Sequence, residues 1–216
     1  MDANFWIQKW EKNDIAFHES DANPALVKYI KELSLVKGSC VFIPLCGKTL
    51  DIAWLLSKGY RVAGAELSPK AIGELFKGLG VKPKVSASGK ASHYSAKNID
   101  IFVGNIFNVS KKMLGPIDAI YDRAALVALP EEMRPRYAKH LMKITHQAPQ
   151  LLISYEYDQA LMEGPPFSVS NKEVKQHYKD RYDLTLLASG NVAGGLKGKC
   201  PAKENVWLLQ NIKNDI

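Results

Sequence analysis

Residues 40–68 read CVFIPLCGKTLDIAWLLSKGYRVAGAELS and contain two expected strands on either side of one expected helix. Cys40–Leu45 and Arg61–Leu67 are short apolar runs rich in strand-forming residues, whereas Leu50–Ser57 is apolar on nearly every side and is closed by Gly59. Strands that are continuous apolar runs and alternate with helices are typical of a mostly parallel sheet with helices on both faces. This stretch therefore predicts a doubly wound α/β domain.

The same alternation continues on both sides of this stretch. Asn23 and Pro24 predict the start of a helix that is over by Gly38. Downstream, the pattern predicts further helices and strands: helices from Ser68 to about Leu79 and from Pro130 to about His146, and strands at Ile99–Val103, Ile117–Arg123 and Leu151–Tyr155. Leu184–Ala188 and Val206–Ile212 read as strands without a helix between them, which predicts an antiparallel pair at the carboxyl-terminal edge of the sheet. Residues 1–22 fit no element by pattern.

Length and composition indicate an ordinary globular domain. The chain has 216 residues, of which 46% are hydrophobic and 24% are charged, and this size suits one hydrophobic core. We therefore expect a single domain over residues 1–216. The apolar runs are shorter than the roughly 20 residues that a membrane-spanning helix needs, and the first residues lack the basic and apolar regions of a signal peptide.

The cysteines favour a reducing compartment. Cys40, Cys46 and Cys200 are odd in number and include no CxxC pair, which suits neither a disulfide framework nor a zinc site. The histidines also lack metal-ligand spacing, because His140 and His146 are six residues apart and do not share a helix face. We expect a cytoplasmic monomer without a bound metal.

The basic charge raises the alternative of a nucleic-acid-binding module. The formal net charge is +7, but no run of five or six like charges occurs, and the lysines of residues 196–203 are interleaved with small residues. This pattern indicates a dispersed, solvated surface, so we expect partners other than nucleic acid or membrane.

In an open α/β sheet the ligand lies beyond the carboxyl ends of the strands, so the loops there are the candidate sites. In the first loop, Gly47, Lys48 and Thr49 copy the end of a phosphate-binding P-loop, but that motif needs a glycine where Phe42 stands. What is left is a tight turn that leads into a helix amino terminus, where backbone N–H groups can bind an anion. A nucleotide-dependent kinase is the alternative that this loop keeps open.

Three further strand ends carry polar side chains. Glu66 lies 19 residues after Gly47, where nucleotide-binding folds place a carboxylate that accepts hydrogen bonds from ribose hydroxyls; the structural alternative is support of the helix cap at Ser68. Asn105 could bond an adenine edge beside Ile106, with the alternative of a turn that buries Phe107.

Asp122 and Arg123 end a buried strand. A charged pair at such a position is costly unless it is exposed or paired, which favours a binding role.

Several segments carry a family resemblance: FWIQKW, IAFHE, NPALV, VFIPLCGKTLDIAWLLSKGYRVAGAELS, YDRAALVALP, YEYDQ and GPPFSVS. The chain resembles the thiopurine S-methyltransferases, a branch of the S-adenosylmethionine-dependent methyltransferases with a Rossmann-like fold. PLCGK followed by ELS and DRAALVAL is specific to that family, since most related methyltransferases have a more glycine-rich first loop. The resemblance spans nearly the whole chain.

The resemblance implies a set of site residues. It places the S-adenosylmethionine contacts at Trp10, Leu45, Gly47, Glu66, Asn105, Ile106 and Arg123, and the substrate contacts at Phe17 and Arg123. It also makes residues 1–22 a segment that closes over the cofactor.

Two departures from the family concern the substrate. The chain has GNIFNV where relatives often carry an acidic residue, and it has no arginine after Arg181 where some relatives place a second substrate arginine. Lys197, Lys199 or Lys203 would have to substitute, or the pocket favours another acceptor.

The expected reaction is in-line methyl transfer to the sulfur of an aromatic or heterocyclic thiol, which gives S-adenosylhomocysteine. A thiolate is a far better nucleophile than a thiol, and a heteroaromatic thiol is already partly ionised near neutral pH, so we assign no catalytic base. A selenium or tellurium metabolite is the alternative acceptor.

Overall fold

The structure is a computed structural model that describes residues 3–15 and 19–212. Its contacts form two compact units, Met1–Ala119 and Ile120–Ile216. The first unit contains α1 (Ala3–Glu11), α2 (Pro24–Tyr29), the 3-10 turn η1 (Ile30–Leu33), β1 (Cys40–Pro44), α3 (Leu50–Ser57), β2 (Arg61–Glu66), α4 (Pro69–Gly78), β3 (Lys84–Ser88), β4 (Ala91–Ala96), β5 (Ile99–Val103), η2 (Ile106–Asn108) and α5 (Lys111–Leu114). The prediction of a single domain over the whole chain stays a prediction.

The second unit begins within β6: Ala119, the first residue of this strand, is the last residue of the first unit. Its elements are β6 (Ala119–Asp122), η3 (Leu126–Ala128), η4 (Glu131–Met133), α6 (Arg134–Thr145), β7 (Gln150–Glu156), η5 (Gln159–Leu161), α7 (Asn171–Tyr178), β8 (Tyr182–Asn191) and β9 (Lys203–Asn211). The helix predicted from Pro130 therefore begins as the 3-10 turn η4 and becomes α6 at Arg134.

The strands of the first unit have the order β3-β4-β5-β2-β1. β1 and β2 are parallel, as are β2 and β5. All five residues of β1 are buried, as expected for a strand covered on both faces. The continuous apolar runs of the sequence thus predicted the parallel strands correctly.

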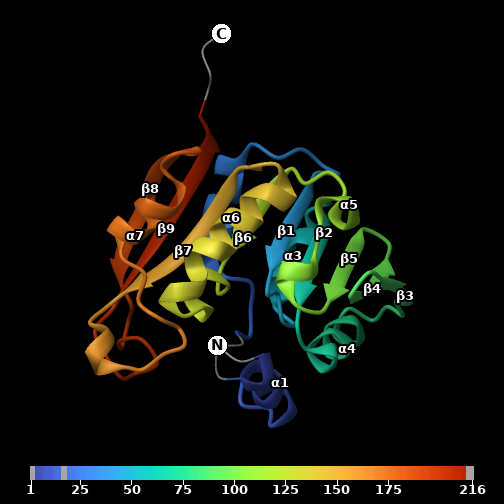
Figure 1. Cartoon of the computed structure of the whole chain (residues 1–216), viewed down its shortest axis with the longest axis horizontal. Coiled ribbons are helices and arrows are strands. Elements are labelled where there is room, and N and C mark those ends of the chain that lie inside the picture. The colour runs from blue at the N-terminus through green and yellow to red at the C-terminus, as the bar shows by residue number, and fades with distance from the viewer. Residues whose placement is uncertain (1–2, 16–18, 213–216) are drawn as a thin grey trace. The chain divides into compact units, whose positions relative to one another are not determined.

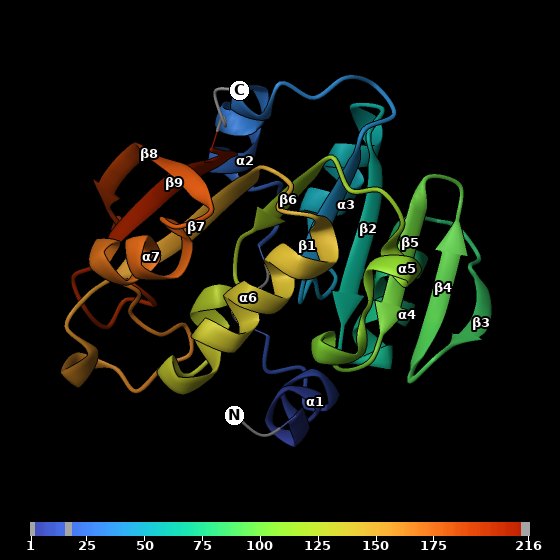
Figure 2. The same ribbon diagram turned by 45° about the horizontal axis from the view of Figure 1, so that its top comes forward.

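A hairpin that the sequence pattern did not predict extends this sheet. β3 and β4 are antiparallel, and β4 pairs antiparallel with β5; Figure 2 shows both strands beside β5 at the end of the sheet. β3 (KVSAS) is mostly exposed, so it lacks the apolar run by which a buried strand is recognised. This hairpin is an antiparallel edge on a parallel sheet, a common addition.

The helices around the first loops begin at residues that the sequence marks. Asn23, Thr49 and Ser68 are the N-caps of α2, α3 and α4, and each side chain accepts a hydrogen bond from a backbone N–H of the first turn. α3 has the predicted bounds, Leu50–Ser57. These caps therefore fix where α3 and α4 begin, just after the loops that follow β1 and β2.

The strands of the second unit have the order β6-β7-β9-β8. β6 and β7 are parallel, whereas β7 with β9 and β9 with β8 are antiparallel, which Figure 1 shows as the long orange and red strands beside β7. The predicted antiparallel pair at the carboxyl-terminal edge is confirmed. Within the described parts of the chain, no helix has the length and apolarity to cross a bilayer.

Candidate active site

The carboxyl ends of β1, β2 and β5 meet at one edge of the first unit's sheet. In the strand register Pro44 is opposite Ala65, and Glu66 is opposite Val103. The Cys46 N–H donates to the Ala65 carbonyl at 3.0 Å, and the Gly104 N–H donates to the Glu66 carbonyl at 2.8 Å. The loops after these three strands, which the sequence singled out, are therefore brought together.

The Glu66 carboxylate joins two of these loops. Its Oε2 accepts the Gly47 N–H at 2.9 Å, and its Oε1 accepts the Ser68 N–H at 2.8 Å. The side chain is buried, and burial raises the pKa of Glu66 while the N–H donors of Ser68 and Gly47 oppose that rise. Glu66 thus supports the turn at Ser68, as the structural alternative expected. Each oxygen also keeps the capacity to accept a further hydrogen bond, as a ribose contact requires.

Gly47 lies directly against the indole of Trp10. Its φ is +51°, and a Cβ at this position would be 2.8 Å from Cζ2 of Trp10, a distance that side chains do not tolerate. Trp10 belongs to α1 and is only 4% exposed. The first-strand loop therefore needs glycine both for its backbone conformation and for the close approach of α1.

Leu45 and Lys48 complete this loop. Leu45 has φ +48° and is partly exposed. The Lys48 Nζ forms an ion pair with Glu74 Oε2 of α4 at 2.7 Å, and this hydrogen bond holds the pKa of Glu74 below its usual value. A P-loop lysine must reach phosphates, whereas Lys48 is turned to α4, so this geometry gives no support to the P-loop alternative.

In the loop after β5, the side chain of Asn105 faces solvent whereas that of Ile106 is buried. Asn105 is exposed, and its Oδ1 accepts the Phe107 N–H at 3.0 Å as the cap of η2. Ile106 is buried, whereas Phe107 is only partly buried. The alternative that this turn buries Phe107 in the core is therefore wrong, since Ile106 takes that place.

Asp122 and Arg123 lie in the second unit, at the end of β6. Asp122 is fully buried; its Oδ1 accepts the N–H groups of Ala125 and Leu126 at 3.2 and 3.1 Å, and its Oδ2 accepts the Tyr137 hydroxyl at 2.7 Å. Burial raises the pKa of Asp122 to about 6. The carboxylate is used to shape the turn, so the binding role that the sequence suggested for the pair can only be assigned to Arg123, which is partly exposed.

The glycine-rich connection between β8 and β9 is a hairpin turn. The N–H groups of Gly195, Leu196, Gly198 and Lys199 all donate to carbonyls within this connection, so they are not directed at a phosphate. Of the late lysines, Lys197 donates from Nζ to the Pro165 carbonyl at 2.7 Å. This contact joins the connection to the loop after β7.

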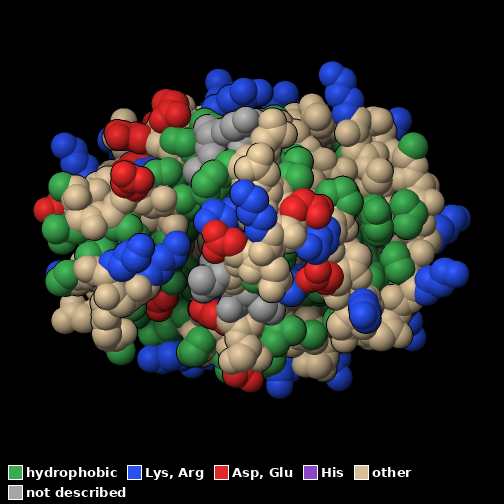
Figure 3. All heavy atoms as spheres, turned by 90° about the horizontal axis from the view of Figure 1, so that it is seen from below, with side chains coloured by type: hydrophobic (Ala, Val, Ile, Leu, Met, Phe, Trp, Pro, Cys, Tyr) green, Lys and Arg blue, Asp and Glu red, His purple; other side chains and the backbone are tan. Residues whose placement is uncertain are grey.

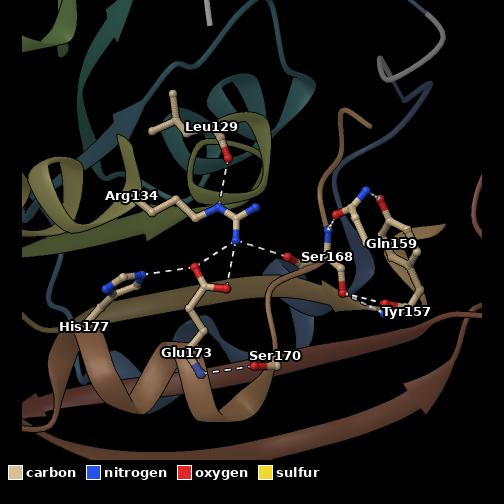
Figure 4. Close-up of polar contacts among 8 residues, drawn as sticks. All are labelled: Leu129, Arg134, Tyr157, Gln159, Ser168, Ser170, Glu173 and His177. Carbon is tan, nitrogen blue, oxygen red and sulfur yellow. Dashed lines mark hydrogen bonds and ion pairs between the residues drawn. The ribbon is translucent and has the colours of Figure 1, made fainter. Parts of the chain in front are cut away.

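Sequence reasoning missed a polar network around Arg134, drawn in Figure 4. The Arg134 side chain is 3% exposed and contacts the Leu129 carbonyl, the Ser168 carbonyl and the Glu173 carboxylate. An arginine three residues before Tyr137, on the apolar side of a helix, is the signal that could have revealed it.

The described residues form no metal site, and the thiol of Cys46 in the first loop is not activated as a nucleophile. Residues 3–15 and 19–212 bring no three His, Cys, Asp or Glu side chains together as a metal site. Cys46 is buried beside Glu66, and burial raises the pKa of its thiol well above the usual value.

The predicted substrate contact Phe17 lies outside the described residues.

Surface charge is dispersed on the face drawn in Figure 3. Blue Lys and Arg side chains are scattered over it, with red Asp and Glu side chains and green hydrophobic side chains between them. This face gives no support to the alternative of a nucleic-acid-binding module.

Comparisons with known proteins place this architecture in a family. A family model described as thiopurine S-methyltransferase (TPMT) matches residues 1–210. The thiopurine S-methyltransferase of Xanthobacter autotrophicus is 52% identical over 97% of this chain and 99% of its own, and that of Teredinibacter turnerae is 54% identical over 97% of each.

A solved structure supports the fold. The Burkholderia thailandensis 1,6-didemethyltoxoflavin-N1-methyltransferase, with bound S-adenosylhomocysteine, superposes with a TM-score of 0.65 at 13% identity, over 97% of this chain and 87% of its own. The likeness to this structure supports the Rossmann-like fold class, and the family model and the relatives confirm the methyltransferase class. The chain belongs to the thiopurine S-methyltransferase family.

Proposed function

We propose that this protein transfers the methyl group of S-adenosylmethionine to the sulfur of an aromatic or heterocyclic thiol such as a thiopurine. The observation that carries the proposal is the arrangement of Glu66, Gly47 and Trp10. A buried carboxylate and a loop glycine that cannot carry a side chain lie at the carboxyl ends of two neighbouring strands, and an indole from α1 packs on that glycine. In an α/β sheet this is where a nucleoside ligand binds.

The described residues fit the cofactor. Glu66 would accept the ribose hydroxyls, because its carboxylate has lone pairs beyond those used by the N–H groups of Gly47 and Ser68. The amino terminus of α3 begins after its N-cap Thr49, two residues beyond Gly47, and favours a carboxylate. Leu45, Asn105, Ile106 and Arg123 complete the proposed contacts.

The transfer itself needs positioning rather than a base. S-adenosylmethionine supplies an electrophilic methyl group on a positively charged sulfur. The thiol loses its proton to solvent beforehand, and the new carbon–sulfur bond forms in line as the old one breaks, with the electron pair passing to the departing sulfur. The protein aligns the two sulfurs and excludes water.

The roles of three features are part of the proposal. Arg123 binds the cofactor and an anionic substrate, and Phe17 lies beside the substrate. The amino-terminal segment, residues 1–22, acts as a lid over the cofactor, which is supported by the packing of Trp10 on Gly47 and by the hydrogen bond from Lys70 Nζ to the Glu11 carbonyl.

We also propose that the protein works as a cytoplasmic monomer on a small molecule. Cys40, Cys46 and Cys200 are all free and buried, which suits a reducing compartment. Light scattering of the purified protein measures the oligomeric state, and a mass of about one chain is the expected result.

The proposal is tested by transfer of a labelled methyl group from S-adenosylmethionine to a thiopurine. Labelled S-methyl product is the expected outcome. If calorimetry detects S-adenosylhomocysteine binding but no thiol is methylated, the acceptor class is wrong, and selenium and tellurium compounds are assayed next. If S-adenosylhomocysteine does not bind, the cofactor site itself is wrong.

A further inference from the structure

The loop that follows β7 is closed on itself. We call residues 157–168 the β7 loop. The Ser168 hydroxyl donates to the Tyr157 carbonyl at 2.8 Å and accepts the Tyr157 N–H at 3.0 Å, so the two ends of the loop meet. The Tyr157 hydroxyl also donates to the Pro166 carbonyl at 2.6 Å, and Gln159 Oε1 accepts the Ser168 N–H at 2.8 Å. Such a compact loop with joined ends is an arrangement often used for binding.

The β7 loop contacts the segment that begins with Arg123. β6 and β7 are parallel neighbours, with Asp122 opposite Leu152, so their carboxyl ends lie at one edge of the sheet. The Phe167 N–H donates to the Val127 carbonyl at 2.6 Å. The loop is thus attached to residues 123–129, at the edge where an α/β sheet binds its ligand.

Arg134 fixes this attachment. Its Nε donates to the Leu129 carbonyl at 2.9 Å, while Nη1 donates to the Ser168 carbonyl at 3.1 Å and lies 2.8 Å from both oxygens of Glu173 (Figure 4). The planar guanidinium suits three partners in fixed directions, which the single ammonium of a lysine does not. Arg134 therefore joins three pieces of chain: the end of residues 123–129, the end of the β7 loop, and α7.

The charge pair is held in a largely buried place. The Arg134 side chain is 3% exposed and the Glu173 side chain 18%, and His177 Nε2 lies 3.1 Å from Glu173 Oε1. Burying such a pair gives little net stability, because desolvation offsets the attraction. The ion pair is therefore better explained by the way it positions the β7 loop than by its contribution to the free energy of unfolding.

The same arginine fixes the aromatic ring of the loop. Arg134 Cζ lies 5.8 Å from the centroid of the Phe167 ring. Gly164 also lies close to this ring: it has φ +82°, and a Cβ there would be 2.5 Å from Phe167 Cδ1. Pro165, Pro166 and Phe167 are each partly exposed, so the loop presents apolar surface of the kind that packs on a flat ring.

We propose that Arg134 is a positioning residue for the methyl acceptor: by holding the β7 loop against residues 123–129, it sets the apolar surface on which an aromatic thiol packs. This inference rests on the proposed function for the identity of the acceptor. Arg134 touches neither acceptor nor cofactor in this scheme. Because Asp122 holds the turn around Arg123 independently, loss of Arg134 leaves cofactor affinity intact.

The test compares Arg134→Lys with Arg136→Lys, the same change at an exposed position of the same helix. For Arg134→Lys we expect the KM for the thiol to rise by about tenfold or more, with kcat and the Kd of S-adenosylhomocysteine changed by less than about twofold. Hydrogen exchange of the amides of residues 157–168 should become faster in this variant. Arg136→Lys should match the wild type in all four measurements.

A second variant disturbs the loop while keeping the ion pair. Gly164→Ala pushes on Phe167, and its control is Gly190→Ala, where a Cβ would meet nothing within 4 Å. We expect Gly164→Ala to raise the KM of the thiol in the same selective way and Gly190→Ala to leave it unchanged. Gly164→Ala also keeps the test informative if Arg134→Lys does not fold.

The possible outcomes separate the inference from the proposed function. An unchanged thiol KM in folded Arg134→Lys and in Gly164→Ala overturns the inference, as does a loss of S-adenosylhomocysteine affinity in parallel with the thiol KM. If the wild type binds S-adenosylhomocysteine but methylates no thiol, the proposed function fails. Hydrogen exchange then decides the positioning role, since unchanged exchange at residues 157–168 in Arg134→Lys overturns it and faster exchange supports it.

Discussion

The phenol hydroxyl of Tyr137 donates to Oδ2 of Asp122 across 2.7 Å, and both side chains are fully buried. Burial and the nearby Asp122 charge raise the pKa of Tyr137 well above its usual value. The other carboxylate oxygen accepts two N–H groups of the turn that contains Arg123. A pair deep in the second unit thereby determines how that turn runs.

Asp122 should make the protein less stable as pH rises. Its pKa is 3.8 as a free side chain and about 6 in the folded protein, so the folded state binds this proton more tightly. The resulting stabilisation is complete below pH 3.8 and is lost as pH rises through about 6.

Asp122→Asn removes this pH dependence. When the pH is raised from acid to neutral, the free energy of unfolding of Asp122→Asn should rise by about 3 kcal/mol relative to that of the wild type. Urea unfolding across this range measures it, and Asp183→Asn, at an exposed position, is the control. A difference that is constant with pH contradicts the account.

Replacement of Glu66 should affect both cofactor binding and stability. Glu66→Ala leaves the N–H groups of Gly47 and Ser68 without their acceptor, which should lower the free energy of unfolding by about 1–3 kcal/mol. It should also weaken S-adenosylhomocysteine binding by about tenfold or more, because ribose hydroxyls lose their acceptor.

Calorimetric titration and thermal unfolding separate the two effects of Glu66→Ala. Glu32→Ala, in η1 away from the strand ends, serves as the comparison. Undiminished affinity for S-adenosylhomocysteine in Glu66→Ala would return Glu66 to a purely structural role.

Gly47 and Trp10 should behave as one coupled pair. Gly47→Ala forces a Cβ to within 2.8 Å of the Trp10 ring and strains a backbone at φ +51°, so we expect a loss of about 1–3 kcal/mol in stability. Trp10→Ala makes room for that Cβ. A double-mutant cycle by urea unfolding should therefore give a smaller loss for the pair than the sum of the single losses; additivity would mean that the contact does not matter.

Arg123→Ala should reduce methyl transfer by more than it reduces stability. Arg123 is partly exposed, and we assign it to binding. The expected result is a fall in kcat/KM of about tenfold or more with a change in unfolding free energy of less than about 1 kcal/mol. Unchanged cofactor affinity together with unchanged turnover would refute the assignment.

The sequence predicted the fold where apolar runs are long and buried. α3 and β5 have the predicted bounds, because both are nearly continuous apolar segments. The β3–β4 hairpin has no continuous apolar run, because serine and other polar residues interrupt both strands, and α7 has only Val174 and Tyr178 buried. Neither element carries a pattern strong enough to recognise.

The site was predictable only in part, for a similar reason. Ligands of an α/β sheet lie beyond the carboxyl ends of the strands, and the strands can be recognised from the sequence. This rule therefore selects the loops with Gly47, Glu66 and Asn105. The function of Asp122 depends on Tyr137, which lies in α6, and that of Arg134 depends on Glu173, 39 residues away. Such partners are brought together by tertiary packing, which spacing in the sequence does not encode.

The indole of Trp10 also gives this protein a built-in optical reporter. It is shielded from water and rests on the glycine of the loop that we assign to the cofactor. We expect a ligand that enters beside Gly47 to alter the surroundings of this ring, so that its fluorescence reports occupancy of the site without any label. Three further tryptophans, Trp6 in α1, Trp54 in α3 and Trp207 in β9, supply the rest of the emission.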